Sequence, residues 1–410
     1  MAEFSDYAWL IGDDDAKDRL ARLAADRRSA LQQLGSLRKE LPAERARLLV
    51  EQLDLRRRGA AKFGRLAERM FFTPVHLEQS TDLWVARYKA ARLAPLASGG
   101  AISDYCCGIG GDLIALAELG AATGWDASPV ACLLAEANVR AATADHGTDN
   151  CAVHCANVEP LQPPAEGAWH LDPDRRAGGS RSTTLERYSP GPELIERWRR
   201  QNAHGAVKLA PAAEPPVQWA EQAELEWITS NRECRQLVAW FGGLAAARGR
   251  RRATVVRTGE DARAGDAATF AGKPDLPCEA AAEPRQFLYD PDPSVLAAHL
   301  LGAQAARHGL QSLGAGAAYL TGERHVQDAL LAAFAVHDCL PLRPAMIAQH
   351  LAARGVGRVE IKKRGVPTDP ETLRKKLKLR GDRSATVVLT RIGERQVAII
   401  AERIVDAAID

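Results

Sequence analysis

Glycines and acids with regular spacing form the part of the sequence best suited to chemistry. The stretch 108–111 (GIGG) follows the short apolar run 102–106 and precedes leucines at helical spacing. Glycine has no Cβ, so a ligand can lie against the backbone there, and the helix that follows offers free N–H groups. Asp126 follows Gly108 by 18 positions, close to the roughly 20 expected for an acid that binds a ribose. The spacing predicts a nucleoside cofactor.

The remaining positions of the stretch distinguish between nucleoside cofactors. Leu113 stands where a dinucleotide fingerprint needs its third glycine. Asp104 comes just before the turn, where a carboxylate suits a ligand with an ammonium group better than a pyrophosphate. An ammonium group and a ribose without a phosphate describe S-adenosylmethionine.

Two segments resemble a known family. DYCCGIGGD and GWDASPVACLLAEANVRA are similar to motifs I and II of class I S-adenosylmethionine-dependent methyltransferases. The resemblance implies an α/β fold with a Rossmann-like sheet. It places Asp104 at the amino acid moiety of the cofactor, Asp126 at the ribose and Asn157, after the third predicted strand, at the adenine. The full set of cofactor residues that we expect is Asp104, Cys106, Gly108, Gly110, Gly111, Asp126, Ala127 and Asn157.

A second candidate segment follows the predicted strand 168–171. Asp172, Pro173 and Asp174 lie where ligands bind in an open α/β sheet, beyond the carboxyl ends of the strands. The segment resembles motif IV (D/N-P-P-x) of nucleic-acid methyltransferases, which implies that Asp172 faces the atom that receives the methyl group. Asp174 replaces the second proline, and no aromatic residue follows to stack on a flipped base. We expect these three residues to be catalytic.

The segment also resembles the DPPR sequence of RNA uridine carbon-5 methyltransferases. Those enzymes need a nucleophilic cysteine later in the chain. Cys234 is the cysteine at a plausible position, but its surroundings do not match that family, and a buried structural thiol is the better interpretation.

The rest of the chain must position these segments. Leucines at helical spacing predict an N-terminal helical region, residues 1–96, in which Gln79, Ser80 and Arg87 are candidates for a lid over the cofactor. A methyltransferase domain follows at 97–260, with strands at 206–210, 225–229 and 253–257 completing the sheet and a polar substrate loop at 177–192. The Gly- and Pro-rich stretch 261–284 predicts a linker.

The C-terminal region has an α+β pattern, interpreted as two small split βαβ units. GRVEIKKRGVPTDPETLRKKLKLRGD resembles the THUMP-like domain of a bacterial methyltransferase-like family, and the block before it resembles that family's ferredoxin-like module. We therefore expect a ferredoxin-like module at 285–343 and a THUMP-like domain at 344–410. THUMP domains proper bind RNA.

Local charge points to RNA independently. Residues 358–403 hold 13 Arg and Lys against six Asp and Glu, whereas the whole chain has a net charge of +2. Such a patch is typical of phosphate binding. The predicted RNA-binding residues are Lys362, Lys363, Arg364, Arg374, Lys375, Lys376, Lys378 and Arg380. Ribosomal or transfer RNA is the expected partner, held by its phosphates.

Other classes are disfavoured. The eight cysteines lack the paired spacing of a zinc site or a disulfide framework, so we expect no metal and reduced thiols. No secretion signal or membrane-spanning run is evident, which favours a cytoplasmic protein. Two alternatives to an RNA methyltransferase stay open: methylation of a protein or small molecule, and an RNA-binding protein that keeps the cofactor fold without turnover.

Overall fold

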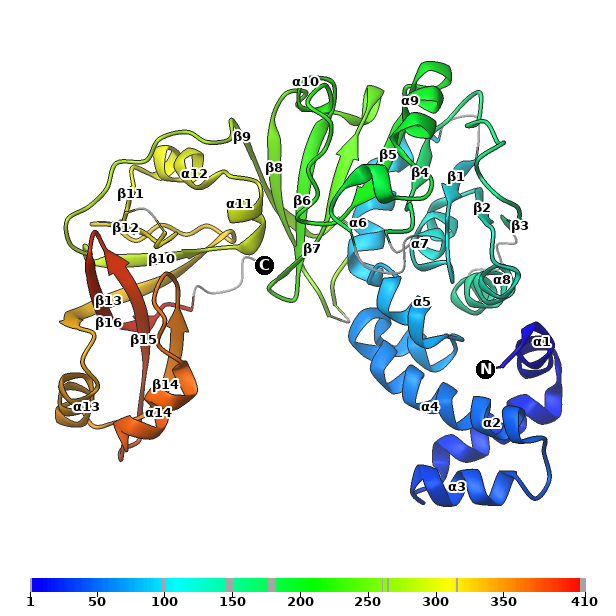
Figure 1. Ribbon diagram of the computed structural model, residues 1–410, viewed down its shortest axis with the longest axis horizontal. Coiled ribbons are helices and arrows are strands. Elements are labelled where there is room, and N and C mark those ends of the chain that lie inside the picture. Colours follow the sequence, from blue (N-terminus) through cyan, green and yellow to red (C-terminus); the bar gives the residue numbers. More distant parts are fainter. Residues whose placement is uncertain are drawn as a thin grey trace. The chain divides into compact units, whose positions relative to one another are not determined.

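The computed structural model describes residues 2–97, 101–144, 150–175, 182–259, 261–263, 265–314 and 316–405, and the chain divides into two compact units (Figure 1). The first unit comprises Met1–Asn231, Arg235–Gly249 and Val256–Ala267. The second comprises Arg232–Cys234, Arg250–Val255 and Ala268–Asp410. The finer domain boundaries expected from the sequence stay predictions.

The N-terminal part of the first unit is helical, as expected. Its helices are α1 (Phe4–Gly12), α2 (Asp14–Ala25), α3 (Ala30–Leu37), α4 (Ala43–Phe63), α5 (Pro74–Gln79) and α6 (Leu83–Leu93). The side chain of Thr73 caps α5 by accepting a hydrogen bond from the backbone N–H of His76, and Asp82 caps α6 in the same way. A capping side chain therefore fixes the residue at which each of these two helices begins.

A mixed sheet forms the centre of the first unit. Its strands there are β1 (Ile102–Tyr105), β2 (Ala122–Asp126), β3 (Cys151–Cys155), β4 (Trp169–Leu171), β5 (Gly205–Leu209), β6 (Glu224–Ser230) and β7 (Glu233–Trp240). The order in the sheet is β3-β2-β1-β4-β5-β7-β6-β8-β9, where β8 is Arg251–Val256 and β9 is Ala267–Gly272. β1 pairs in parallel with β2 and β4, and β5 pairs antiparallel with β7. This mixed α/β architecture confirms the predicted fold class. The order of the strands reverses beside β1, where ligands bind in such sheets.

Helices flank this sheet in the first unit. They are α7 (Gly111–Leu119), α8 (Pro129–Thr143), α9 (Pro192–Gln201) and α10 (Trp219–Gln222). Ser128 caps α8 and Pro129 occupies its first turn, which explains why the helix begins directly after β2. Leu113, Ile114 and Leu134 are fully buried in the core that these helices form with the sheet.

The second unit contains a separate sheet and two helix pairs. The strands are β10 (Phe287–Pro291), β11 (Gln311–Ser312), β12 (Leu320–Gly322), β13 (Leu331–Pro341), β14 (Val356–Lys363), β15 (Arg383–Ile392) and β16 (Arg395–Arg403), in the order β11-β12-β10-β13-β16-β15-β14. The helices are α11 (Pro293–Ala297), α12 (Leu301–His308), α13 (Pro344–Ala353) and α14 (Pro370–Leu377). One continuous sheet therefore contains all these strands, where the sequence predicted two small split βαβ units.

Helix α14 is the crossover between the two parallel strands β14 and β15. Asp369 caps it and Pro370 occupies its first turn. Leu373 and Leu377 bury one face of the helix, and the basic residues occupy the remainder. The charged segment of the sequence is thus held on a helix whose apolar face is anchored.

Several expected elements differ from the structure. The sequence analysis predicts no strand over the residues of β7 and assigns those of β9 (Ala267–Gly272) to the linker, whereas the predicted strand at 253–257 is β8 (Arg251–Val256). β7 runs antiparallel to β5 and lies between β5 and β6 in the sheet. Helices α11 and α12 are separated at His299, whose φ of 58° is left-handed.

Part of the expected substrate loop, residues 177–181, lies outside the described residues. Residues 185–187 within the remainder form a 3₁₀ turn. Within the part of the chain that the structure describes, no helix is both long and apolar enough to cross a membrane.

Candidate functional site

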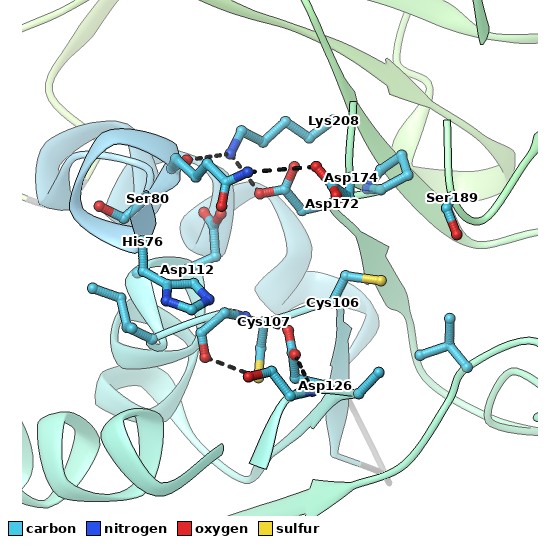
Figure 2. Close-up of a pocket in the computed structure, with 18 of the residues that line it drawn as sticks. His76, Ser80, Cys106, Cys107, Asp112, Asp126, Asp172, Asp174, Ser189 and Lys208 are labelled. Atoms are coloured by element: carbon cyan, nitrogen blue, oxygen red, sulfur yellow. Dashed lines mark hydrogen bonds and ion pairs between the residues drawn. The ribbon is translucent and has the colours of Figure 1, made fainter. Parts of the chain in front are cut away.

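A cavity of about 400 Å³ lies beyond the carboxyl ends of β1, β2, β4 and β5 in the first unit (Figure 2). Its volume is in the range of small-molecule sites. It brings together residues that are far apart in the sequence. The lining residues are His76, Gln79, Ser80, Thr81, Cys106, Cys107, Gly108, Ile109, Gly111, Asp112, Asp126, Ala127, Ser128, Asn157, Val158, Glu159, Asp172, Pro173, Asp174, Arg175, Ser189, Pro190 and Lys208.

The glycine turn forms the floor of this cavity because its backbone conformation and surroundings leave no room for side chains. Gly108 and Gly110 have φ angles of 55° and 86°, which disfavour other residues. A Cβ on Gly111 would lie 3.2 Å from the carbonyl oxygen of Thr81. Gly108 and Gly111 line the cavity, whereas Gly110 lies beneath it at the start of α7.

Asp126 lies where the sequence analysis expected the ribose acid. Its Oδ2 accepts a hydrogen bond of 2.9 Å from the backbone N–H of Gly108, and its Oδ1 accepts one of 2.8 Å from Ser128. Each carboxylate oxygen can accept further bonds, because an ionised carboxylate has about four acceptor positions. The side chain is therefore fixed in orientation and still able to bind hydroxyl groups.

Ala127 and Asn157 also line the cavity, next to Asp126. Asn157 is exposed, and its Oδ1 accepts a hydrogen bond of 3.0 Å from the backbone N–H of Glu159. Because the amide oxygen of Asn157 accepts this bond, its NH₂ group remains available as a donor. The adenine contact expected for Asn157 stays a prediction.

The structure does not bring Asp104 to the cavity. Its side chain is fully buried, and its Oδ1 lies 2.7 Å from Nδ1 of His170 on β4. Burial raises the pKa of the Asp104 carboxyl, although His170 opposes the shift. The residue is thus paired inside the core of the first unit, away from the residues that line the cavity.

Asp112 is the acid that lines the cavity in this region, and the sequence analysis missed it. Its Oδ1 pairs with the ammonium of Lys89 at 2.7 Å, and its Oδ2 accepts a hydrogen bond from the hydroxyl of Thr81. Burial alone would raise the pKa of the Asp112 carboxyl. The interactions with Lys89, His170 and Lys208 lower this pKa by more than burial raises it, so the net pKa lies well below its usual range. Lys89 also contacts Nε2 of His170 at 3.2 Å, which makes a continuous buried network from Asp112 to Asp104.

Asp172, Pro173 and Asp174 all line the cavity, as expected from their position after β4. Lys208, on the neighbouring strand β5, pairs with Asp172 Oδ2 at 2.5 Å. Gln79 Nε2 lies 3.4 Å from Asp174 Oδ1, and the Gln79 carbonyl oxygen lies 3.4 Å from Lys208 Nζ. Figure 2 shows these contacts as one group at the rim opposite Asp126. The sequence signal for Lys208 was a single cation within an otherwise apolar strand.

Helix α5 contributes the remaining wall. Gln79 and Ser80 line the cavity as expected, whereas Arg87 does not, because it forms two contacts of 2.8 Å with Glu118. His76 was missed; burial lowers the pKa of its ring, so the imidazole is neutral at pH 7.

Lys62 of α4 holds the carboxyl end of this helix. Its ammonium donates hydrogen bonds to the carbonyl oxygens of Leu77, Glu78 and Ser80 at 2.7, 2.9 and 2.7 Å. Burial and the nearby Lys208 lower the pKa of Lys62 to about 8, which still leaves the ammonium protonated at pH 7.

Cysteine chemistry is not supported at this site. Cys106 lines the cavity, but burial raises the pKa of its thiol well above the ordinary value. Burial likewise raises the pKa of Cys234 to about 12, and this residue does not line the cavity. Among the described residues no group of three or more His, Cys, Asp or Glu side chains could hold a metal ion.

The second unit presents the basic residues of the C-terminal region. Lys362 and Arg364 form ion pairs of 2.6 and 2.7 Å with Asp290, and their role in RNA binding stays a prediction. Arg374 is exposed but donates to the carbonyl oxygen of Val359 at 2.6 Å. We call five other exposed cations the basic surface: Lys363 at the end of β14, Lys375 and Lys376 on α14, and Lys378 and Arg380 after it.

Comparisons with known proteins agree with this geometry. Residues 331–403 match a family described as THUMP domain-like. Two relatives from Mycobacterium tuberculosis, strains CDC 1551 / Oshkosh and ATCC 25618 / H37Rv, are each named an uncharacterized S-adenosylmethionine-dependent methyltransferase. The chain is 36% identical to each over 361 residues, which cover 85% of this chain and 94% of the relative.

A solved structure shows the same fold. A proposed methyltransferase from Porphyromonas gingivalis W83 aligns over 94% of this chain and 98% of its own, with a TM-score of 0.73 and 17% identity. The chain belongs to the family of S-adenosylmethionine-dependent methyltransferases. It is an enzyme with S-adenosylmethionine as its cofactor, as the sequence analysis predicted.

The residues present suit this cofactor. The backbone of the turn is open to a ligand at Gly108 and Gly111, which both line the cavity. Asp126 offers carboxylate oxygens with acceptor positions to spare, as the hydroxyl groups of a ribose require. No phosphate-binding cation lies at the turn itself, where the described side chains nearest the cavity include Asp112 and Asp126.

Proposed function

We propose that the methyl acceptor of this enzyme is RNA, bound through phosphates by the basic surface of the second unit. The observation that carries the proposal is that four of these five cations lie on α14 or directly after it, inside the THUMP domain-like match. Clustered exposed Lys and Arg form the electrostatic footprint of nucleic-acid binding. No aromatic residue belongs to the surface, which favours contact with phosphates over stacking of bases.

We assign the cofactor to the cavity of the first unit. The backbone at Gly108 and Gly111 would hold its amino acid moiety, Asp126 its ribose, and Ala127 with Asn157 its adenine. Asp112 lines this cavity, whereas Asp104 is fully buried and does not line it. When bound, S-adenosylmethionine supplies a sulfonium methyl group that a nucleophile can accept.

The chain's own contribution to the reaction is positioning and proton handling. Asp172 lies on the rim opposite Asp126 and is fixed by Lys208, so it can orient an acceptor by accepting a hydrogen bond from it. Gln79 connects α5 to Asp174 over the same rim. Together these contacts would restrict water and align the acceptor with the cofactor.

Transfer of a labelled methyl group tests the proposal. The purified chain is incubated with methyl-labelled S-adenosylmethionine and total RNA from cells in which the gene has been deleted. Label that enters RNA, and that is lost with Asp172→Ala, is the expected result. A matched control is Asp54→Ala, which changes an exposed acid on α4.

Other outcomes would identify the alternatives. Label that enters protein or a small molecule and not RNA would overturn the RNA proposal while leaving the methyltransferase. Salt-dependent binding of RNA without transfer to any RNA would indicate an RNA-binding protein that keeps the cofactor fold.

A further inference from the structure

His76 of α5 lines the cavity, and no sequence motif assigns it a role. Its ring reaches from the helix toward the glycine turn, where a Cβ on Gly108 would lie 3.9 Å from Cδ2 of the ring (Figure 2). Burial lowers the pKa of the ring, and the carboxylates of Asp126 and Asp174 oppose this shift. Asp126 lies at the ribose end of the cavity and Asp174 at the opposite rim, so His76 lies between the two ends.

Thr73 fixes the orientation of this ring. Its Oγ1 lies 2.7 Å from Nδ1 of His76 and accepts a hydrogen bond of 3.1 Å from the backbone N–H of the same residue. A hydroxyl oxygen has two acceptor positions, so it can accept from the backbone N–H and from Nδ1–H together. With its proton on Nδ1, the neutral ring has a lone pair on Nε2, and no residue that the structure describes forms a hydrogen bond to Nε2.

His76 is suited to take a proton at neutral pH. Burial lowers the pKa of the ring from its ordinary value of 6.5, so the ring is unprotonated at pH 7. An unprotonated imidazole can act as a general base. The thiols of Cys106 and Cys107 also line the cavity, but burial raises the pKa of both well above the ordinary value, so they keep their protons.

The surroundings of the ring also suit the imidazolium that forms when Nε2 takes a proton. The Nδ1–H bond to Thr73 can be kept in both states of the ring, because the hydroxyl oxygen acts as an acceptor in each. The carboxylates of Asp126 and Asp174 favour a positive charge on the ring. The site can therefore hold the proton until it passes to water.

We propose that His76 is the general base of the methyl transfer, and that its Nε2 takes the proton from an N–H or O–H group of the acceptor. The inference rests on the proposed function, because both place cofactor and acceptor in this cavity, but it holds for any acceptor. The acceptor's lone pair forms the new bond to the methyl carbon as the bond from that carbon to the sulfonium sulfur breaks, and the sulfur keeps the electron pair. The electrons of the N–H or O–H bond stay on the acceptor, and its proton passes to Nε2.

Variants of His76 test this role with whichever acceptor takes label in the experiment above. In His76→Ala we expect kcat to fall about 100-fold or more, while the Kd for S-adenosylmethionine changes by less than about threefold. Added imidazole should restore at least about a tenth of the parent kcat in His76→Ala, because the free base can occupy the vacated space. It should restore none in His76→Phe, whose ring fills that space. His325→Ala, which changes an exposed histidine of the second unit, should leave kcat unchanged.

Chemical modification tests the position of the ring without turnover. Diethyl pyrocarbonate acylates unprotonated imidazole, and mass spectrometry of the peptides identifies the modified histidines. We expect His76 to be modified in the free chain and protected when S-adenosylhomocysteine is bound. His170, with 1% of its surface exposed, should stay unmodified in both samples.

Several outcomes would overturn the role of His76. They are a kcat for His76→Ala within about threefold of the parent, a loss that parallels a loss of cofactor affinity, and a loss that imidazole does not restore or restores equally in His76→Phe. A ring that is unmodified, or modified but not protected, would overturn it as well. Label that enters protein or a small molecule would overturn the RNA proposal alone, whereas a chain that labels no acceptor would overturn both.

Discussion

Asp126 carries the clearest residue-scale prediction, because both its oxygens are oriented by backbone N–H groups and still have acceptor positions. Removing the carboxylate in Asp126→Ala deletes the bonds expected to the ribose. Hydrogen bonds to charged groups contribute about 1.5–3 kcal/mol, so the Kd for S-adenosylmethionine should rise about 10- to 100-fold, as measured by isothermal titration calorimetry. Glu136→Ala, an exposed acid on α8, serves as the control. Equal affinity in Asp126→Ala and the parent chain would remove Asp126 from the site.

The buried pair of Asp112 and Lys89 makes a second prediction, about pH. The folded-state pKa of Asp112 is depressed, so its contribution to stability is complete above the ordinary Asp pKa of about 3.9 and is lost as the pH falls below it. Asp112→Asn leaves Lys89, with 2% of its side chain exposed, without its charge partner. We expect a loss of about 3–5 kcal/mol in the free energy of unfolding at pH 7.

Urea denaturation at several pH values measures this effect. The difference between Asp112→Asn and the parent chain should narrow once the pH falls below about 4, because Asp112 then becomes protonated in the unfolded parent. The double variant Asp112→Leu with Lys89→Met, which removes both charges, should recover much of the loss. A difference that does not depend on pH would show that the pair is not the source of the stability.

The same residues show what could and could not be read from the sequence. Gly108, Asp126 and Asp172 could be predicted, because local turn geometry and strand ends dictate their positions. Asp104 could not, because its partner His170 is 66 positions away and becomes a neighbour only when β1 pairs with β4. Lys208 was visible only as a cation inside an apolar strand, and its pairing with Asp172 depends on β4 lying beside β5.

At the scale of elements, the strands with apolar runs and following glycines were predictable, and β7 was not. β6 and β7 are joined by Asn231 and Arg232, with φ angles of 50° and 62°. A two-residue turn of this kind usually contains glycine, and the absence of glycine concealed the hairpin. The tertiary pairing of β7 with β5 then determines its position between β5 and β6, which no local pattern indicates.

We expect the stability of helix α5 to come from the contacts of Lys62 more than from the helix's own six residues. Three carbonyl oxygens at its end accept from one ammonium, and so short a helix has little stability alone. In Lys62→Met we expect the amides of residues 77–80 to exchange hydrogen at least about tenfold faster, which hydrogen–deuterium exchange with mass spectrometry measures. Exchange should be unchanged in Lys17→Met, an exposed lysine of α2. Unaltered exchange at 77–80 in Lys62→Met would show that the cap is dispensable.

At the scale of the whole molecule, the net charge of +2 conceals an uneven distribution of charged residues along the chain. The sequence located the basic region but could not show which of its cations form ion pairs with distant acids, because those pairs are set by the fold. Asp290 of β10 pairs with both Lys362 and Arg364, over 72 and 74 positions of sequence. Of the predicted cations, those that are exposed lie on α14, after it and at the end of β14.

The dependence of RNA binding on salt tests whether this basic surface acts as proposed. Each phosphate contact contributes about 0.7 to 0.9 to the slope of log K against log salt. The double variant Lys375→Ala with Lys376→Ala should therefore reduce the slope by about 1.5 to 2, with no change in the Kd for S-adenosylmethionine. Fluorescence anisotropy of labelled RNA across a range of potassium chloride concentrations gives the slope. Lys17→Ala with Lys39→Ala removes the same charge from the N-terminal helical region and should leave the slope unchanged. If both double variants reduce the slope equally, binding reflects overall charge and α14 is not the RNA-binding helix.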